Sequence, residues 1–307
     1  MVKAAVDSLC KDLGDDLNGR NRTEALGRNN KQIVLLAPEF PPLPAEELLQ
    51  IVNGLNDCMA RYTNANPQLI GTALIAPPTA LVGKDKGSYP GRSYVKDGLN
   101  SFRRAIRELH LKAVMLQSNY DSIYLGDEIF SPYFALAEEL DVPVFIHPSG
   151  RAVGSAAMTR HRLSLYTGYL NDQRTALLDI VMSGTYEKFP KLKIIATHLG
   201  GGILTSLGRF GVLSSGSPQD TLYVDKGGHE RRLRNSIEYY LKKIYYDCND
   251  AKKVDIEHAV SVVGEDRLLT GTDFPFNNDT FTRGVLAQLD HSVARKIAFT
   301  TADRLFD

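Results

Sequence analysis

Two histidines and one aspartate of this 307-residue chain stand at the ends of apolar segments. His147, His198 and Asp273 follow, in order, Val142–Ile146, Leu192–Ala196 and Arg267–Thr270. In parallel α/β folds, catalytic groups collect at the carboxyl ends of the strands. Neutral imidazole and carboxylate are ordinary ligands for a divalent ion, and a third group beside them can transfer protons. The pattern therefore indicates a metal or proton-transfer site.

The alternative for each of these residues is a purely structural role. A single histidine at a strand end is more often a satisfied structural residue than a ligand. Three such residues at the ends of three separate strands favour a site. The turn Gly200–Gly202 leads from the strand before His198 into a predicted helix. It either presents backbone N–H groups to an anion or simply permits a tight turn.

Further candidates lie in the segments that follow predicted strands. Asn119 and Asp247 either line the opening of the site formed by His147, His198 and Asp273, or they cap turns. Arg151, Arg160 and Arg162, in the long segment after His147, bind a substrate carboxylate or stay solvated. The residues that we assign to substrate binding are Asn119, Arg151, Gly200, Gly201 and Phe276.

Strands and helices alternate along the chain. Strands are predicted at Gln32–Ala37, Leu69–Ala76, Leu111–Leu116, Val142–Ile146, Leu192–Ala196, Ile244–Tyr246 and Arg267–Thr270. Helices are predicted at Met1–Leu17, Ala45–Asn64, Leu99–Leu109, Ser131–Leu140, Asp172–Ser183, about Ile203–Val212, about His229–Lys242 and Val254–Val263. Asn119–Glu128 is expected to be a polar loop, and 81–98 and 149–169 are expected to be loop insertions.

This alternation fits a doubly wound sheet or a (β/α)₈ barrel. The dinucleotide fingerprint fails because Thr205 stands where its last glycine is required, which favours the barrel. We expect one domain over residues 1–307, with residues 1–30 atypical. A closed barrel needs eight strands, whereas seven are counted.

Composition limits the classes of partner. Lys plus Arg and Asp plus Glu number 36 each, so no net field favours nucleic acid or an acidic membrane. The 43% of hydrophobic residues suffices for a large core, and no apolar run approaches the roughly 18 residues of a membrane span. Three cysteines without a CxxC pair favour a reducing compartment, so we expect a cytoplasmic protein.

Three motifs resemble the amidohydrolase-related family, in particular its aminocarboxymuconate-semialdehyde decarboxylase branch. They are VPVFIHP (Val142–Pro148), FPKLKIIATHLGGGI (Phe189–Ile203) and RLLTGTDFPF (Arg267–Phe276). Asn53–Pro78 also matches a segment of that branch, which includes γ-resorcylate, salicylate-type and 5-carboxyvanillate decarboxylases. The resemblance extends from about Asp15 to the C-terminus.

The resemblance implies a (β/α)₈ TIM barrel, a divalent ion such as zinc or manganese, and a homodimer or higher homo-oligomer. It implies that His147 binds metal, that His198 is catalytic, and that Asp273 both binds metal and transfers protons. The implied reaction is non-oxidative decarboxylation of a small unsaturated or hydroxyaromatic carboxylic acid, in keeping with secondary metabolism.

The chain departs from the family at the first strand, which normally ends in His-x-His or Glu-x-His. Neither motif occurs before Gln32. With Val2–Cys10 placed as that strand, Leu9 and Lys11 occupy the ligand positions and cannot bind a cation. The helical spacing of apolar residues in Met1–Leu17 argues instead that this strand is absent. We therefore expect metal binding to be weak or lost.

Three functions remain open from the sequence. The first is a decarboxylase-like carbon–carbon lyase, which we favour. The second is a hydrolase that cleaves a lactone or amide with His198 or Asp273 as the base. The third is a catalytically impaired barrel that binds a ligand, or a truncated gene product.

Overall fold

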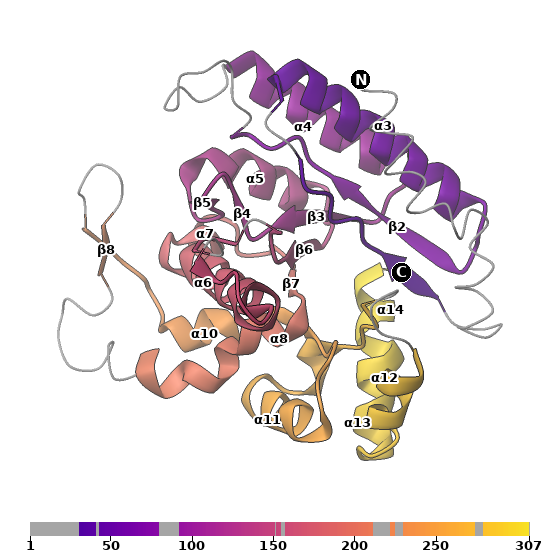
Figure 1. The fold of residues 1–307 in the computed structure, drawn as a ribbon, viewed down its shortest axis with the longest axis vertical. Coiled ribbons are helices and arrows are strands. Elements are labelled where there is room, and N and C mark those ends of the chain that lie inside the picture. The colour runs from indigo at the N-terminus through magenta and orange to yellow at the C-terminus, as the bar shows by residue number, and fades with distance from the viewer. Residues whose placement is uncertain are drawn as a thin grey trace. The chain divides into compact units, whose positions relative to one another are not determined.

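The seven predicted strands all form (Figure 1). They are β1 (Gln32–Val34), β2 (Leu69–Leu74), β3 (Ala113–Gln117), β6 (Val144–His147), β7 (Ile194–Ala196), β10 (Tyr245–Asp247) and β11 (Leu268–Leu269). The computed structural model describes residues 31–40, 43–79, 92–150, 152–154, 157–210, 222–224, 230–273 and 279–306. The helix predicted for Met1–Leu17 and the question of a strand there lie outside these residues.

The chain comprises two compact units, each described here by itself. The first contains Met1–Leu116 and Pro132–Val144, and the second contains Gln117–Ser131 and Phe145–Asp307. In the first unit, β1, β2 and β3 are neighbours in that order and pair in parallel. In the second unit, the strand order is β6, β7, β10 and β11, with parallel pairing of β7 with β10 and of β10 with β11.

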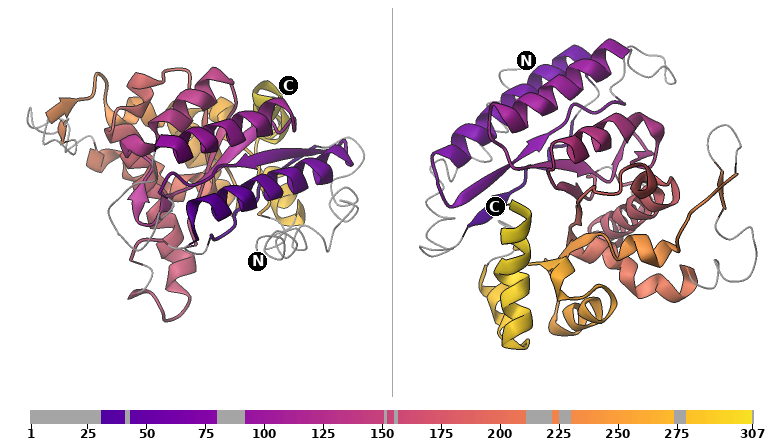
Figure 2. Two further views of the ribbon diagram at one scale, coloured as in Figure 1. Left: turned by 90° about the horizontal axis from the view of Figure 1, so that it is seen from above. Right: turned by 180° about the vertical axis from the view of Figure 1, so that it is seen from behind.

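Helix α3 (Ala45–Asn64) covers the strands of the first unit and runs beside α4 (Arg92–Arg107) (Figure 2). Its buried face carries Leu48, Ile51, Val52, Leu55 and Met59, the spacing expected of an amphipathic helix. The buried amide of Asn56 pairs with both backbone groups of Leu74: Leu74 N–H donates to Oδ1 at 2.8 Å and Nδ2 donates to the carbonyl oxygen at 3.0 Å. This pairing ties α3 to β2.

Helix α4 begins earlier than predicted, so the expected loop insertion at 81–98 is wrong from Arg92 onward. Tyr94, Phe102 and Ala105 are buried at helical spacing. A Cβ on Gly98 would lie 2.5 Å from the Tyr133 hydroxyl oxygen. The glycine that suggested a loop therefore allows α4 to pack closely on α5 (Ser131–Glu139).

The other differences lie in the second unit. Asn119–Glu128, predicted as a loop, contains the antiparallel pair β4 (Asn119–Tyr120) and β5 (Ile123–Tyr124). The expected loop at 149–169 ends in a π-helix, Ser164–Gly168, that leads into α6 (Tyr169–Met182). A Cβ on Gly168 would lie 3.1 Å from Met158 Sδ, so its small size serves packing.

The single helix predicted at about His229–Lys242 is also wrong. Glu230–Arg232 forms β9, which pairs with β8 (Leu222–Val224), and α10 covers only Ile237–Leu241. Ser236 accepts a hydrogen bond from Tyr239 N through its hydroxyl oxygen, at 3.2 Å, and so caps α10. Capping by serine marks a helix start, which explains why the helix does not extend further back.

The second unit ends in helices. They are α11 (Lys253–Val263), a 3-10 turn at Glu265–Arg267, α12 (Asp279–Leu286), α13 (His291–Arg295), a π-turn at Lys296–Thr300 and α14 (Thr301–Phe306). The rings of Phe306 and Phe145 stack with centroids 6.2 Å apart, which attaches α14 to β6. Among the residues described, no helix has both the length and the apolar character of a membrane span.

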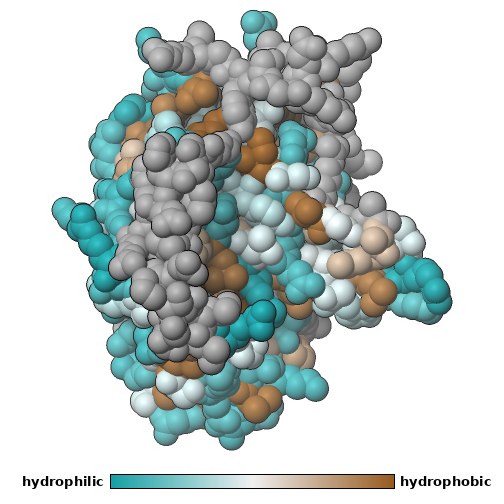
Figure 3. Space-filling view, turned by 90° about the vertical axis from the view of Figure 1, so that its left-hand side faces the viewer, coloured by the Kyte–Doolittle hydropathy of each residue, from teal (hydrophilic) through white to brown (hydrophobic). Residues whose placement is uncertain are grey.

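Among the residues that the structure describes, few large apolar side chains are exposed. They are Val153, Leu163, Leu165, Tyr166, Tyr239, Val254, Phe281 and Phe299. On the face drawn in Figure 3, apolar residues stand in several separate places among polar ones. Scattered apolar residues of this kind are normal on protein surfaces.

Candidate active site

His147, His198 and Asp273 come together in the second unit, as the sequence predicts. One ring nitrogen of each histidine and one carboxylate oxygen of Asp273 all lie within 4.8 Å of one another. The two imidazole rings meet edge to face, with centroids 5.7 Å apart and an interplanar angle of 63°. Each of the three side chains is partly exposed, so a ligand can reach them.

His147 is the last residue of β6 and its ring is held by the backbone. Nδ1 lies 2.8 Å from the carbonyl oxygen of Pro148, an acceptor, which requires the proton on Nδ1. Nε2 is then left with a free lone pair. Burial, reinforced by the charge of His198, lowers the His147 pKa to about 4. His147 is therefore a neutral imidazole at physiological pH, the form that binds metals.

His198 is fixed at two points, by Asp247 at the end of β10 and by Asn249, which follows that strand. Its backbone N–H donates to Asp247 Oδ1 at 2.9 Å, and its Nδ1 lies 3.0 Å from the amide nitrogen of Asn249. Asp247 Oδ1 also accepts from Asn249 N at 3.1 Å. The buried Asp247, for which the sequence left a mouth-lining or a capping role open, therefore binds backbone groups.

The predicted turn at Gly200–Gly202 forms with left-handed backbone angles that already begin at His198. It leads into a 3-10 helix, Ile203–Ser206, where the next helix is predicted to start. His198 and Leu199 both have φ of 48°, and Gly200, Gly201 and Gly202 have φ of 63°, 65° and 75°. Such angles cost L-residues about 1–2 kcal/mol each but cost glycine little. The strain on His198 and Leu199 is stored at the candidate site, where strained residues concentrate.

Close packing explains why glycine occupies the middle of this turn. A Cβ on Gly201 would lie 2.1 Å from the carbonyl oxygen of Leu170 in α6. Arg174, also on α6, donates from Nη2 to the Gly201 carbonyl oxygen at 2.8 Å. The Gly200 N–H donates to the Thr197 carbonyl oxygen at 2.8 Å, so this group is already used. Substrate binding by Gly200 and Gly201 remains a prediction.

Asp273 is the third member of the group, and it too has a left-handed backbone, with φ of 50°. Burial, helped by the charge of Asp250, raises the pKa of its carboxyl. His198 and a hydrogen bond from the Asn249 side chain act in the opposite direction. A carboxyl group with a raised pKa takes up and releases protons more readily near neutral pH.

A buried carboxylate, Asp172, organises the neighbouring loops, and sequence reasoning missed it. Ser118 Oγ donates to it, as do Asn119 Nδ2 at 2.7 Å, the Tyr124 hydroxyl at 2.8 Å and Val153 N at 3.0 Å. The Oδ1 atom of Asn119 accepts from Ser122 N at 3.1 Å. The Asn119 amide is thus engaged at both ends, and its assignment to substrate binding stays a prediction.

The remaining predicted residues are not brought into the group. Arg151 and Phe276 lie outside the described residues, and Arg160 and Arg162 are exposed. The contacts of Asn249 and Arg174 were not anticipated either. Asn249 could have been noticed because it follows a strand end by two residues, whereas nothing in the sequence marks Arg174.

The donor set suits a divalent ion. Neutral His147, with Nε2 free, and the Asp273 carboxylate are typical nitrogen and oxygen ligands. Histidines that bind a metal through one ring nitrogen usually donate a hydrogen bond from the other, as His147 Nδ1 does to the Pro148 carbonyl oxygen. No other comparable group of histidine, cysteine and carboxylate ligands was found in the ranges that the structure describes.

Comparison with known proteins identifies relatives of the chain. A family model described as Amidohydrolase matches residues 84–307. The 2-amino-3-carboxymuconate-6-semialdehyde decarboxylase of Dictyostelium discoideum is 26% identical over 231 residues, which cover 75% of this chain and 58% of that protein. The γ-resorcylate decarboxylase of Polaromonas sp. is 26% identical over 218 residues, which cover 66% of this chain and 64% of that protein. The chain thus spans less than two thirds of the length of these relatives.

Solved structures share the fold. The 5-carboxyvanillate decarboxylase of Sphingomonas paucimobilis superposes with a TM-score of 0.74 at 21% identity, covering 89% of this chain and 78% of that one. A dihydroxybenzoic acid decarboxylase of Polaromonas sp., solved with manganese and 2-nitroresorcinol, gives 0.70 at 19% identity, covering 86% and 76%. The predicted (β/α)₈-type fold class is confirmed by these likenesses, with seven strands of the parallel sheet among the described residues.

Proposed function

The chain belongs to the amidohydrolase family, and from this premise we propose that it is a carboxy-lyase that decarboxylates a small hydroxyaromatic or unsaturated carboxylic acid. The observation that carries the proposal is the convergence of His147, His198 and Asp273 within 4.8 Å. The similar proteins named above are decarboxylases of carboxylated hydroxyaromatic or muconate-type acids, which supports the reaction and the substrate class.

In this proposal His147 and Asp273 hold a divalent ion, manganese or zinc. When bound, such an ion supplies a Lewis acid that polarises the oxygens of the substrate. Manganese in the Polaromonas structure supports the class of ion. The His-x-His or Glu-x-His of the family does not occur between Met1 and Gln32, so the proposal names two protein ligands, His147 and Asp273.

The reaction needs one proton at one carbon. The bond between that carbon and the carboxylate breaks, CO₂ leaves, and the electron pair that stays on the carbon takes up the proton. His198 and Asp273 are the two groups placed to deliver it. The left-handed turn and the bond from its N–H to Asp247 hold His198 rigidly, which favours efficient proton transfer.

Hydrolysis on the same barrel is the second reaction that these residues could perform, with His198 or Asp273 activating water. We place decarboxylation first because the relatives and the solved structures named above carry decarboxylase names. A homo-oligomeric state and a cytoplasmic location remain predictions from the sequence.

The proposal is tested by CO₂ release from purified protein supplied with Mn²⁺ or Zn²⁺. 2,6-Dihydroxybenzoate, 5-carboxyvanillate and a carboxymuconate semialdehyde form the substrate panel. We expect CO₂ from at least one acid, and a loss of about 100-fold or more in His198→Gln, the usual contribution of a positioned general acid. The same substitution at the exposed His291, His291→Gln, provides a control. Hydrolysis of lactones or amides without CO₂ release would overturn the proposal.

A further inference from the structure

Asn249 is the buried residue that contacts the ring of His198. It is only 5% exposed and lies just after β10. Its amide nitrogen is 3.0 Å from His198 Nδ1 and 3.4 Å from Asp250 Oδ2, and its side chain also bonds to the Asp273 carboxyl. One amide group therefore touches both the histidine and the aspartate of the candidate site.

The surroundings decide which end of the amide faces the histidine. With Nδ2 toward His198, the N–H groups meet the imidazole nitrogen and two carboxylates, all of which accept hydrogen bonds. The exchanged orientation would place the amide oxygen against the same carboxylates, which repel it. Asn249 Oδ1 has no hydrogen-bond partner among the described residues, so the contacts of Nδ2 set the orientation.

An amide nitrogen can only donate, so His198 Nδ1 must accept and cannot carry the proton of a neutral ring. The proton of neutral His198 then lies on Nε2. His147 is arranged in the opposite way, because Pro148 accepts at its Nδ1 and so its Nε2 keeps a lone pair. The two histidines thus have opposite tautomers: His147 offers a lone pair and His198 offers an N–H.

We propose that Asn249 is a positioning residue that fixes neutral His198 in the Nε2–H tautomer, so that His198 presents an N–H hydrogen-bond donor to the substrate and not a lone pair to a metal. The tautomer assignment stands on the hydrogen bonds alone, and the consequence for decarboxylation rests on the function proposed above. Asn249 acts through His198 and need not touch the substrate.

The test is imidazole NMR on metal-free protein labelled with ¹⁵N-histidine, in mildly alkaline buffer where imidazoles are neutral. The His198 signals are assigned by their loss in His198→Gln. We expect the Nε2–H pattern for His198 and the Nδ1–H pattern for His147. An Nδ1–H pattern for His198 in the wild-type protein would overturn the proposal, even if Asn249→Leu does not fold.

Asn249→Leu keeps much of the side-chain volume and removes the donor. We expect His198 to show both tautomers in this variant, with kcat falling about tenfold or more while KM changes little. Asn171→Leu is the matched control, because it makes the same substitution at an exposed amide of α6 that bonds to Thr167, and its His198 tautomer should be unchanged. An unchanged Nε2–H pattern in Asn249→Leu would refute the role of Asn249.

The two proposals fail separately. If the NMR patterns are as expected but no acid loses CO₂, the proposed function is wrong and the tautomer assignment stands. If CO₂ is released but wild-type His198 carries its proton on Nδ1, the positioning role is wrong and decarboxylation stands.

Discussion

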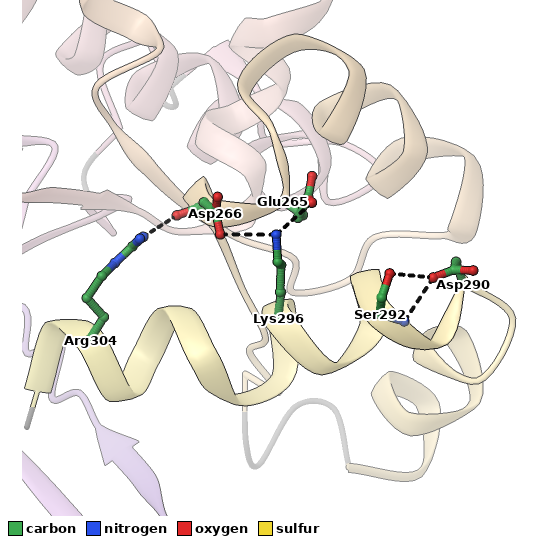
Figure 4. Close-up of polar contacts among 6 residues, drawn as sticks. All are labelled: Glu265, Asp266, Asp290, Ser292, Lys296 and Arg304. Atoms are coloured by element: carbon green, nitrogen blue, oxygen red, sulfur yellow. Dashed lines mark hydrogen bonds and ion pairs between the residues drawn. The ribbon is translucent and has the colours of Figure 1, made fainter.

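The strand-end region around β6, β7 and β10 and the C-terminal helices α12–α14 use charged groups in different ways. In the first region, Asp247 at the end of β10 and Asp172 in the first turn of α6 are buried, and each accepts several hydrogen bonds. In the C-terminal region, Lys296 lies 2.9 Å from Glu265 and 3.6 Å from Asp266, and these side chains remain a third to more than half exposed (Figure 4).

The difference shows which charged groups fix the position of the segments around them. A buried carboxylate must find donors or destabilise the fold, so each one dictates the position of the segments around it. Exposed ion pairs are screened by water and salt, and their loss changes little. Even Asp290, whose carboxylate accepts from Ser292 N at 2.9 Å, caps α13 in an exposed position. Rigidity is therefore concentrated beside His147 and His198.

Asp172→Ala should cause the largest loss of stability among the substitutions that test this comparison. The change leaves Ser118, Asn119, Tyr124 and the Val153 N–H without their common acceptor in a buried place. We expect a loss of about 4–5 kcal/mol in the free energy of unfolding, measured by urea denaturation. The control is Asp303→Ala, at an exposed position of α14. Equal effects of the two substitutions would contradict the distinction between buried and exposed carboxylates.

Gly201→Ala tests the left-handed turn. The new Cβ meets the Leu170 carbonyl oxygen at 2.1 Å and the backbone keeps φ near 65°, so we expect a loss of about 3–4 kcal/mol. Gly154→Ala has φ of 80° but open space, and should cost only about 1 kcal/mol. Gly208→Ala has neither problem and should be neutral or slightly stabilising. A Gly201 variant no worse than Gly154→Ala would show that the turn relaxes freely.

Acid should destabilise the metal-free protein through His147. Its pKa of about 4 in the folded chain lies below its ordinary 6.5, so between these values the unfolded chain binds a proton that the folded chain does not. Stability is fully present above pH 6.5, falls by about 3 kcal/mol as the pH drops to 4, and then levels off. Unfolding with chelator present should show this loss in wild type and less of it in His147→Gln. If wild type and His147→Gln lose the same amount of stability as the pH falls, the lowered pKa of His147 is contradicted.

Lys296→Ala should have the smallest effect. It removes the ion pairs with Glu265 and Asp266, which are exposed to solvent. We expect only a slight fall in Tm, which disappears in 1 M salt because screening already weakens the pairs. A large fall that persists in high salt would mean that the C-terminal helices depend on this contact as the strand ends depend on Asp172.

The sequence predicts the seven strands because each is a short apolar run bounded by turn residues. It misses the start of α4, where Gly98 serves packing, and it misses the cap at Ser236. It brings His147, His198 and Asp273 to one site because strand ends converge in this type of fold.

Other features of the site depend on contacts between distant segments. Three consecutive glycines predict a turn but not its left-handed course, which the Leu170 carbonyl and Arg174 of α6 determine. Asp172 lies in a helix, where an acidic residue is ordinarily expected at the surface. Its burial becomes understandable only from its donors, which come from residues 118–124 and 153.

Deuterium incorporation during turnover tests the central claim most directly. In D₂O with Mn²⁺, the wild-type protein should release CO₂ from one of the panel acids and place a single deuterium on the carbon that carried the carboxylate. His198→Gln should lose both signals together, whereas the exposed-site control His291→Gln should retain both. A protein that turns over no acid, or a His198→Gln variant that releases CO₂ and incorporates deuterium at the wild-type rate, would contradict a proton-transfer role for this site.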